Sequence, residues 1–180
     1  MKKVLILSGS PRKGGNSDIL CDQFMKGALE QGNEVEKIFI AEKKIAPCSG
    51  CYFCRKSGGR CALNDDMGDI LQKIIDCDVL VLSSPVYFYS VCAQMKIVID
   101  RTVARWTEIA NKDLYYITTA AEDEADTMDG TLACFHGFAM CIDGYEEKGT
   151  LYGRGVTDKG DVRERAELMQ IAYEMGLASK

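Results

Sequence analysis

Several features are missing from this sequence, and each absence excludes a class of protein. Lys and Arg form no cluster beyond short pairs such as Lys43 and Lys44, and the net charge is -5, which argues against binding to nucleic acid or to an anionic membrane. No apolar run approaches the length of a transmembrane helix, and the first residues resemble a strand rather than the apolar core of a signal peptide. We therefore expect a cytoplasmic protein without a membrane segment.

Histidine and repetitive sequence are also scarce. The only histidine, His136, lies beside Phe135 and near Phe138 and Met140, so we expect it to be packed or hydrogen-bonded rather than to act as a general base. We find no internal repeat, linker or low-complexity tract. With 180 residues, 47% of them hydrophobic, the chain is long enough for one domain with a sizeable core, which we expect to span residues 1–180.

What the sequence does contain is a loop suited to an anion, from Ser8 to Ser17. It lies between a short apolar strand at 4–7 and a helical pattern that starts near residue 18. A loop at this point presents free backbone N–H groups and the positive end of a helix dipole. Glycines let the backbone approach closely, and polar side chains add donors. The candidate binding residues are Ser8, Ser10, Arg12, Asn16 and Ser17.

Two better-known phosphate loops do not match. The spacing of Gly9 and Gly14 begins like a P-loop, but Gly15 and Asn16 stand where Lys and Ser or Thr are required. The dinucleotide-binding pattern also fails, because Gly9 has no glycine two positions on. A loop with several hydroxyl groups and one Arg suits a terminal monophosphate, as in FMN. The alternative is a Gly- and Ser-rich turn with no ligand.

The order of the predicted elements indicates an α/β fold. Strands are expected at 3–8, 34–40, 79–83, 114–118 and 148–152, and helices at 17–30, 65–75, 91–103, 127–142 and from about 160 to 176. This alternation predicts a doubly wound, five-stranded parallel sheet. In one common version, the flavodoxin-like order 2-1-3-4-5, FMN binds between the first and third strands.

A second loop, which follows the third predicted strand, is rich in aromatic residues. It contains Tyr87, Phe88 and Tyr89 within residues 83–90. Aromatic residues that face a phosphate loop are what a flavin ring requires. The alternative is that they pack in a subunit interface or in the core of the loop.

The third notable segment is a cysteine-rich loop at about 46–64. Cys48, Cys51 and Cys54 are each separated by two residues, and Cys61 follows six residues later. Bacterial ferredoxins use the same short spacings for a 4Fe-4S cluster. A structural zinc site usually has two separated cysteine pairs, so zinc comes second, and a set of reduced thiols or an adventitious disulfide also stays open. The remaining five cysteines are expected to pack as small apolar residues.

Together these motifs resemble the flavodoxin-like NADPH-dependent FMN reductases, and the cysteine loop resembles the branch called iron-sulfur flavoproteins. The resemblance rests on residues 8–17, on 84–87, and on Lys96, Asp100 and Arg101. It implies FMN as the cofactor and NAD(P)H as the electron donor. It also implies a homo-oligomer, a dimer or a tetramer, and a redox partner that is a small molecule or a protein. It also implies that the flavin ring is bordered by Pro85, Val86, Tyr87, Phe88 and Tyr89, with a third contact from Thr118 and Thr119. For Lys96, Asp100 and Arg101 we expect an ion-pair network on the surface or in a subunit contact.

The sequence therefore predicts an FMN-dependent oxidoreductase that takes a hydride or electrons from NAD(P)H or a protein donor. It would pass them to a flavin, quinone or protein acceptor, with a 4Fe-4S cluster held by the four loop cysteines. One alternative is a flavodoxin-type electron carrier without NAD(P)H activity. Another is a phosphatase, because Cys54 and Arg60 have the Cys-x5-Arg spacing, although the loop follows no strand directly.

Overall fold

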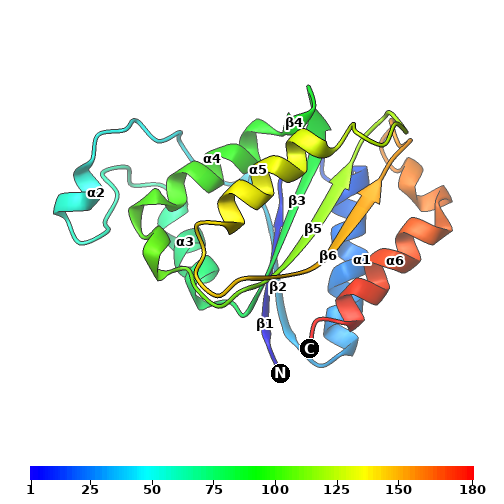
Figure 1. Cartoon of the computed structure of the whole chain (residues 1–180), viewed down its shortest axis with the longest axis horizontal. Coiled ribbons are helices and arrows are strands. Elements are labelled where there is room, and N and C mark those ends of the chain that lie inside the picture. The colour runs from blue at the N-terminus through cyan, green and yellow to red at the C-terminus, as the bar shows by residue number, and fades with distance from the viewer.

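The computed structural model of residues 1–180 contains one parallel sheet with helices on both faces (Figure 1). Its parallel strands lie in the order β2-β1-β3-β5-β6. Counting only parallel strands, this is the predicted flavodoxin-like order 2-1-3-4-5, and the prediction is confirmed. The strand bounds are β1 Lys3–Ser8, β2 Glu34–Phe39, β3 Val79–Tyr87, β5 Asp113–Thr119 and β6 Glu146–Gly153.

The central strands are apolar because both of their faces are covered. Alternate side chains enter two separate cores. On one face, Leu5, Leu80 and Tyr116 belong to a core beneath α3 (Met67–Asp76), α4 (Ala93–Arg101) and α5 (Asp129–Ala139). On the other, Ile6 and Val81 pack beneath α1 (Asn16–Glu30) and α6 (Ala166–Leu177). None of the helices is both long and apolar enough to cross a lipid bilayer.

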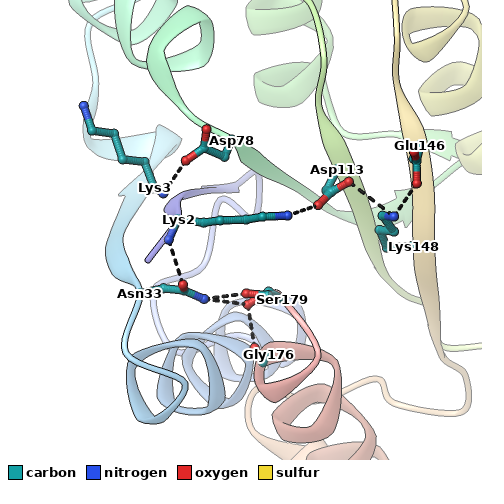
Figure 2. Close-up of polar contacts among 9 residues, drawn as sticks. All are labelled: Lys2, Lys3, Asn33, Asp78, Asp113, Glu146, Lys148, Gly176 and Ser179. Atoms are coloured by element: carbon teal, nitrogen blue, oxygen red, sulfur yellow. Dashed lines mark hydrogen bonds and ion pairs between the residues drawn. The ribbon is translucent and has the colours of Figure 1, made fainter.

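Polar contacts fasten the amino ends of the strands, at the edge of the sheet opposite the predicted binding loops (Figure 2). The Lys2 ammonium lies 2.5 Å from Asp113, and the backbone N–H of Lys2 donates to Asn33. Asn33 in turn donates to the backbone oxygen and the hydroxyl of Ser179, just after α6. This network fixes the end of the chain beside β1 and β2, and it leaves the carboxyl edge to the loops.

The sequence prediction missed three local features. The third strand continues to Tyr87 and turns back as β4 (Ser90–Val91), an antiparallel partner of β3. A short helix, α2 (Phe53–Lys56), forms inside the cysteine loop. The last helix begins at Ala166 and not near residue 160, because a 3-10 turn at Asp161–Glu164 comes first.

The segment that contains α2 projects from the body of the molecule beyond α3 and α4 (Figure 1). Most of its residues are exposed. Between residues 43 and 64 it has five cationic side chains and no carboxylate, whereas the chain as a whole has a net charge of -5. The cysteine loop is therefore a locally basic part of an acidic protein.

Candidate functional site: three loops at the carboxyl edge of the sheet

The first loop leaves β1 at Ser8 and enters α1 at Asn16, with Gly15 at the N-cap position. At the start of α1, the backbone N–H groups of Asn16, Ser17 and Asp18 have no hydrogen-bond partner in the chain. The first such bond in the helix is the one from Ile19 N–H to Gly15, at 2.9 Å. Three free donors at the positive end of a 15-residue helix have the arrangement of an anion-binding site, which we call the anion cradle.

The three serines of this loop have different environments. The Ser8 hydroxyl is fully buried and donates to Asp18 at 2.9 Å. The Ser10 hydroxyl accepts a hydrogen bond from the Arg12 N–H at 3.1 Å and so shapes the turn itself. The Ser17 hydroxyl forms no hydrogen bond within the chain, and its oxygen is not completely buried. Of the three predicted hydroxyl groups, Ser17 is the one left available to a ligand.

Asn16 and Arg12 both reach toward the loop after β6. The Asn16 amide donates to the backbone oxygen of Asp158 at 2.9 Å, and its oxygen accepts from the N–H groups of Gly160 and Val162. The Asn16 side chain is thus engaged within the protein, and only its backbone N–H stays available to an anion. Arg12 is exposed, with one long contact of 3.4 Å to the backbone oxygen of Thr157, so its guanidinium can turn toward a bound phosphate.

Asp18 and Lys37 stabilise this loop through hydrogen bonds, and the sequence did not predict a role for either residue. Asp18 is 3% exposed and accepts hydrogen bonds from Ser8, from Gly14 N–H and from Lys37. Burial raises the pKa of Asp18, but the Gly14 and Lys37 donors outweigh it and hold the pKa below its ordinary value. The available signal was the position of Asp18, three residues after the N-cap Gly15, where an acidic side chain bonds back to the loop.

The first and second loops are in direct contact through Gly9. The Gly9 N–H donates to the Ser83 oxygen at 2.8 Å, and the Cys92 thiol donates to the Gly9 oxygen at 2.9 Å. A Cβ at Gly9 would lie 2.7 Å from that Ser83 oxygen and 3.1 Å from the Cys92 sulfur. Glycine is therefore required for this close approach, which sets the spacing of the two loops.

The second loop is a β-hairpin with aromatic residues at its tip. Phe88 and Tyr89 form the two-residue turn between β3 and β4, with φ values of 50° and 58°. Two positive φ values define a type I′ turn, which is usually occupied by Asn and Gly. Phe88 is fully exposed, and Tyr87 and Tyr89 are 42% and 58% exposed. The structure thus presents three aromatic side chains to solvent on the loop that contacts the first loop through Ser83.

The third loop follows β5 and faces the hairpin across a cavity of about 210 Å³. Phe88, Tyr89, Glu122 and Thr127 are among the residues that line it. Thr118 lies outside this cavity, because its fully buried hydroxyl donates to the Leu151 oxygen at 3.2 Å. The predicted contact of the Thr118 side chain with a cofactor is therefore not supported by its position, since alternation along β5 turns it into the core.

The four loop cysteines open onto one shared space. Cys48, Cys51, Cys54 and Cys61 all line a small cavity of about 30 Å³ together with Arg101. No three of these thiols are close enough to one another to hold a metal ion in this arrangement of the loop. Cys51 has a pKa below the ordinary thiol value, chiefly because its sulfur accepts a hydrogen bond from the Phe53 N–H.

Arg101 corrects one expectation from the sequence. Lys96 and Asp100 do form an exposed ion pair on α4, at 2.5 Å, as expected. Arg101, however, is 2% exposed and pairs with Asp65 through two nitrogen–oxygen contacts of 2.7 and 2.8 Å. The helical register places Arg101 on the inner face of α4, toward the base of the cysteine loop.

The expectation for the other cysteines holds only in part. Cys21, Cys77 and Cys92 are buried, as packing residues should be. Cys134 is half-buried and Cys141 is exposed, so the prediction was wrong for Cys141, which lies beyond the end of α5. His136 packs edge-on against Tyr116 and lies 3.5 Å from Glu147, in agreement with a packed or hydrogen-bonded role.

The strand order β2-β1-β3-β5-β6, with helices on both faces and the two loops at the switch point between β1 and β3, defines the flavodoxin-like class of folds. Residues 2–133 match the NADPH-dependent FMN reductase family, and the chain belongs to that family. The family resemblance predicted from the sequence is thus confirmed.

The relatives found by sequence include several iron-sulfur flavoproteins. One from Methanocaldococcus jannaschii is 42% identical over 100 residues, which is 56% of this chain and 51% of that protein. One from Archaeoglobus fulgidus is 46% identical over 101 residues, 56% of this chain and 45% of that protein. The chain thus spans about half the length of the curated relatives it matches.

The fold is also similar to that of solved reductases. The crystal structure of an FMN-dependent NADH-azoreductase from Bacillus anthracis in complex with FMN superposes with a TM-score of 0.72 at 17% identity. The superposition covers 99% of this chain and 97% of that chain. At this identity, the likeness supports the shared fold.

Proposed function

We propose that this protein is an FMN-dependent oxidoreductase that takes electrons from NAD(P)H or a protein donor. The observation that carries the proposal is that the free N–H groups of Asn16, Ser17 and Asp18 and the exposed aromatic hairpin lie on two loops that are joined by the hydrogen bond from Gly9 N–H to the Ser83 oxygen. A cofactor with a phosphate at one end and a flat apolar ring at the other fits both parts. When bound, FMN accepts a hydride and releases electrons to a second acceptor.

The residues of the chain would bind and orient such a cofactor. The three free N–H groups and the Ser17 hydroxyl suit the phosphate oxygens, and Arg12 adds a charged donor from the solvent side. Val86 to Tyr89 would border the ring with backbone groups and aromatic faces. No side chain of the hairpin is required as an acid or base, because orientation and exclusion of water are the contributions of the protein.

The cavity between the hairpin and the third loop gives a substrate access to the same edge of the sheet. Its lining includes the Glu122 carboxylate, which keeps the pKa of Tyr89 above its ordinary value through a hydrogen bond. We propose this cavity as the place where the electron donor and the electron acceptor approach. The acceptor would be a quinone, a flavin or a protein.

For the cysteine loop we propose a 4Fe-4S cluster bound by Cys48, Cys51, Cys54 and Cys61. The chemistry of the donor set supports this, because all four cysteines line one cavity and the first three have the two-residue spacing of ferredoxin ligands. The thiols would have to move closer together to bind the cluster, because no three of them are within reach of one metal ion in this arrangement. The surrounding cationic residues Arg55, Lys56 and Arg60 would offset the negative charge of four thiolates. A cluster there would carry single electrons between the flavin and a partner. Zinc ligation by the same thiols is the alternative.

Two other functions are less well supported. A flavodoxin-type carrier would share the FMN site but would not oxidise a nicotinamide. A Cys-x5-Arg phosphatase needs its thiol in a loop that wraps a phosphate, whereas Cys54 lies inside α2, and the Arg60 guanidinium lies 5.7 Å from the centre of the Phe53 ring. We also propose a cytoplasmic location and assembly with further copies of the chain.

The test uses protein purified without oxygen and titrated with FMN. We expect saturable binding of one FMN per chain and steady-state oxidation of NADH or NADPH with an added quinone. Binding without any nicotinamide oxidation would indicate the carrier, and no FMN binding would contradict the proposal. In the same preparation we expect about four irons and four sulfides per chain. Cys51→Ala should remove the iron and leave FMN bound, whereas stoichiometric zinc would overturn the cluster.

A further inference from the structure

The cysteine loop is attached to the protein by a short neck, which we define as Lys44, Ala46, Cys61, Asp65 and Asp66. The two sides of the neck are hydrogen-bonded to each other. Asp66 N–H donates to the Lys44 oxygen at 3.0 Å, and Lys44 N–H donates back to the Asp66 carboxylate at 2.7 Å. Ala46 N–H donates to Asp65 at 3.0 Å. The chain therefore enters and leaves the loop at almost the same place.

Beyond the neck the loop has no other hydrogen-bonded attachment. The hydrogen bonds of residues 47–60 all stay within this segment, such as those from Gly59 N–H to the Cys54 oxygen and from the Ser57 hydroxyl to the Arg60 oxygen. Its other contacts with the body are packing contacts: Gly59 lies against Ala104 and Arg105, and Cys48, Cys51 and Cys54 line a cavity together with Val103 and Ala104. The neck is therefore the hydrogen-bonded attachment that fixes the four thiols relative to the sheet.

Arg101 lies at the centre of this neck and contacts both of its sides. On the entry side, one guanidinium nitrogen donates to the Ala46 oxygen at 2.5 Å. On the exit side, the guanidinium holds both oxygens of Asp65, and its second terminal nitrogen lies 3.5 Å from the Cys61 sulfur. The Arg101 hydrogen bond is the main reason that the pKa of Asp65 lies below its ordinary value. Both groups are therefore charged at neutral pH.

We propose that Arg101 is the positioning residue of the cysteine loop: it closes the neck and directs an N–H donor at the sulfur of Cys61. The second part of this inference rests on the cluster proposed above. A planar guanidinium can serve the Ala46 oxygen, the Asp65 carboxylate and the Cys61 sulfur at once, whereas a lysine ammonium is a point charge and cannot span them. A donor to a ligating sulfur stabilises the more negative, reduced form of a cluster and raises its reduction potential.

The first test needs no metal. In metal-free Arg101→Lys protein, amide exchange measured by NMR should become at least tenfold faster at Ala46 and Asp66, because both amides are donors in the neck. Amides of β1 and β3 should exchange as in the wild type, which would show that the fold is kept. Lys96→Met serves as the matched control, since it removes an exposed cation from the same helix, and it should leave Ala46 and Asp66 unchanged. Wild-type protection at both amides in Arg101→Lys would overturn the positioning role.

The second test addresses the sulfur contact in protein loaded with iron and sulfide. Arg101→Lys should lower the midpoint potential of the cluster relative to wild type and to Lys96→Met, because the N–H donor to Cys61 is lost. An unchanged potential in a variant with an opened neck would overturn the donor role of Arg101. If the wild type takes up no iron, the cluster proposal fails, and the amide exchange still decides whether Arg101 holds the loop.

Discussion

The Asp18 carboxylate and the Lys37 ammonium lie 2.9 Å apart beneath the first loop, where Asp18 is almost fully buried. Asp18 also accepts from the N–H of Gly14, so this one side chain connects the ion pair to the backbone of the anion cradle. A negative charge this close to a phosphate site is tolerated because its oxygens are already occupied by three donors. The pair therefore acts as a support of the cradle and not as a ligand.

Replacing Asp18 should destabilise the protein and weaken FMN binding together. Asp18→Asn should lower the free energy of unfolding by about 1.5–3 kcal/mol, the typical contribution of hydrogen bonds to a charged group. Asp22→Asn is the matched control, because Asp22 also pairs with Lys37 but its side chain is 54% exposed, and it should cost less than about 1 kcal/mol. Urea unfolding at pH 7 measures both. Equal effects of the two substitutions would contradict the role of burial.

The same pair predicts the acid limb of the stability curve. The pKa of Asp18 in the folded state is below its ordinary value of 3.8, so its contribution to stability is present above about pH 4 and is lost as the pH falls through the folded pKa. Between pH 7 and pH 3 the wild type should lose more stability than Asp18→Asn. Parallel curves for the two proteins would show that Asp18 is not responsible for this part of the acid sensitivity.

Arg12 should contribute to the affinity for FMN without contributing to the fold. Arg12→Ala should weaken FMN binding by roughly tenfold to a hundredfold, as expected for about 1.5–3 kcal/mol from a charge-assisted contact. Lys13→Ala provides the control, because it removes the same charge from the same loop, but the Lys13 ammonium pairs with Glu42 at 2.6 Å. Fluorescence titration of FMN measures both. Wild-type affinity in Arg12→Ala would remove Arg12 from the site.

The contact between the first two loops should not tolerate a methyl group. Gly9→Ala places a Cβ 2.7 Å from the Ser83 oxygen and should cost about 1–3 kcal/mol of stability, with a loss of FMN affinity. Gly68→Ala, in the exposed first turn of α3, meets no atom within 4 Å and should stabilise by up to about 1 kcal/mol. Thermal unfolding distinguishes them. A Gly9→Ala protein as stable as wild type would show that the loops can separate.

The residues at the tip of the aromatic hairpin should lower the stability of the protein and increase its affinity for FMN. Phe88→Asn with Tyr89→Gly relieves two positive φ angles and should stabilise by about 1–2 kcal/mol, but it should weaken FMN binding because the ring faces are lost. Tyr52→Asn is the control, since Tyr52 is also exposed at a φ of 57°, but it lies in the cysteine loop. It should keep the FMN affinity. Full affinity in the double variant would place the flavin ring elsewhere.

The acidic third loop should set the choice of nicotinamide. Glu122, Asp123, Glu124 and Asp126 are all exposed around the proposed entrance, and they should repel the extra phosphate of NADPH. The ratio of kcat/KM for NADPH to that for NADH should therefore stay below about tenfold, or 1.4 kcal/mol. It should rise when Glu122→Gln and Glu124→Gln are combined, and it should rise with salt. A strong preference for NADPH in the wild type would contradict this.

The sheet order could be predicted from the sequence because each parallel strand is a short apolar run followed by a helical pattern, a signal that survives without tertiary information. The hairpin could not be predicted, since Phe88 and Tyr89 occupy positive φ angles for which the usual signal is Asn and Gly. The burial of Arg101 could not be predicted either, because only tertiary packing brings Asp65 to it, whereas Lys96 and Asp100 form their exposed pair within one helix.

The loop between β1 and α1 lies where the sequence predicted it, but the roles of its side chains were not all evident. Hydroxyl and amide groups at the end of a strand can form hydrogen bonds either with a ligand or within the protein, and the sequence does not distinguish these two roles. Asn16 belongs to the second kind, since its three partners lie about 145 positions along the chain. For Ser17 we expect the first role, because its hydroxyl forms no hydrogen bond within the chain.

The neck of the cysteine loop has a practical consequence for engineering the protein. Because residues 47–60 form no hydrogen bond with the parallel sheet, the whole segment can be exchanged for a short Gly- and Ser-containing bridge between Ala46 and Cys61. Such a protein would keep the three loops at the carboxyl edge and lose every predicted iron ligand but one. The reverse graft is equally direct: a segment that carries its thiols on a closed neck is a transferable unit that could be inserted into another flavodoxin-like scaffold.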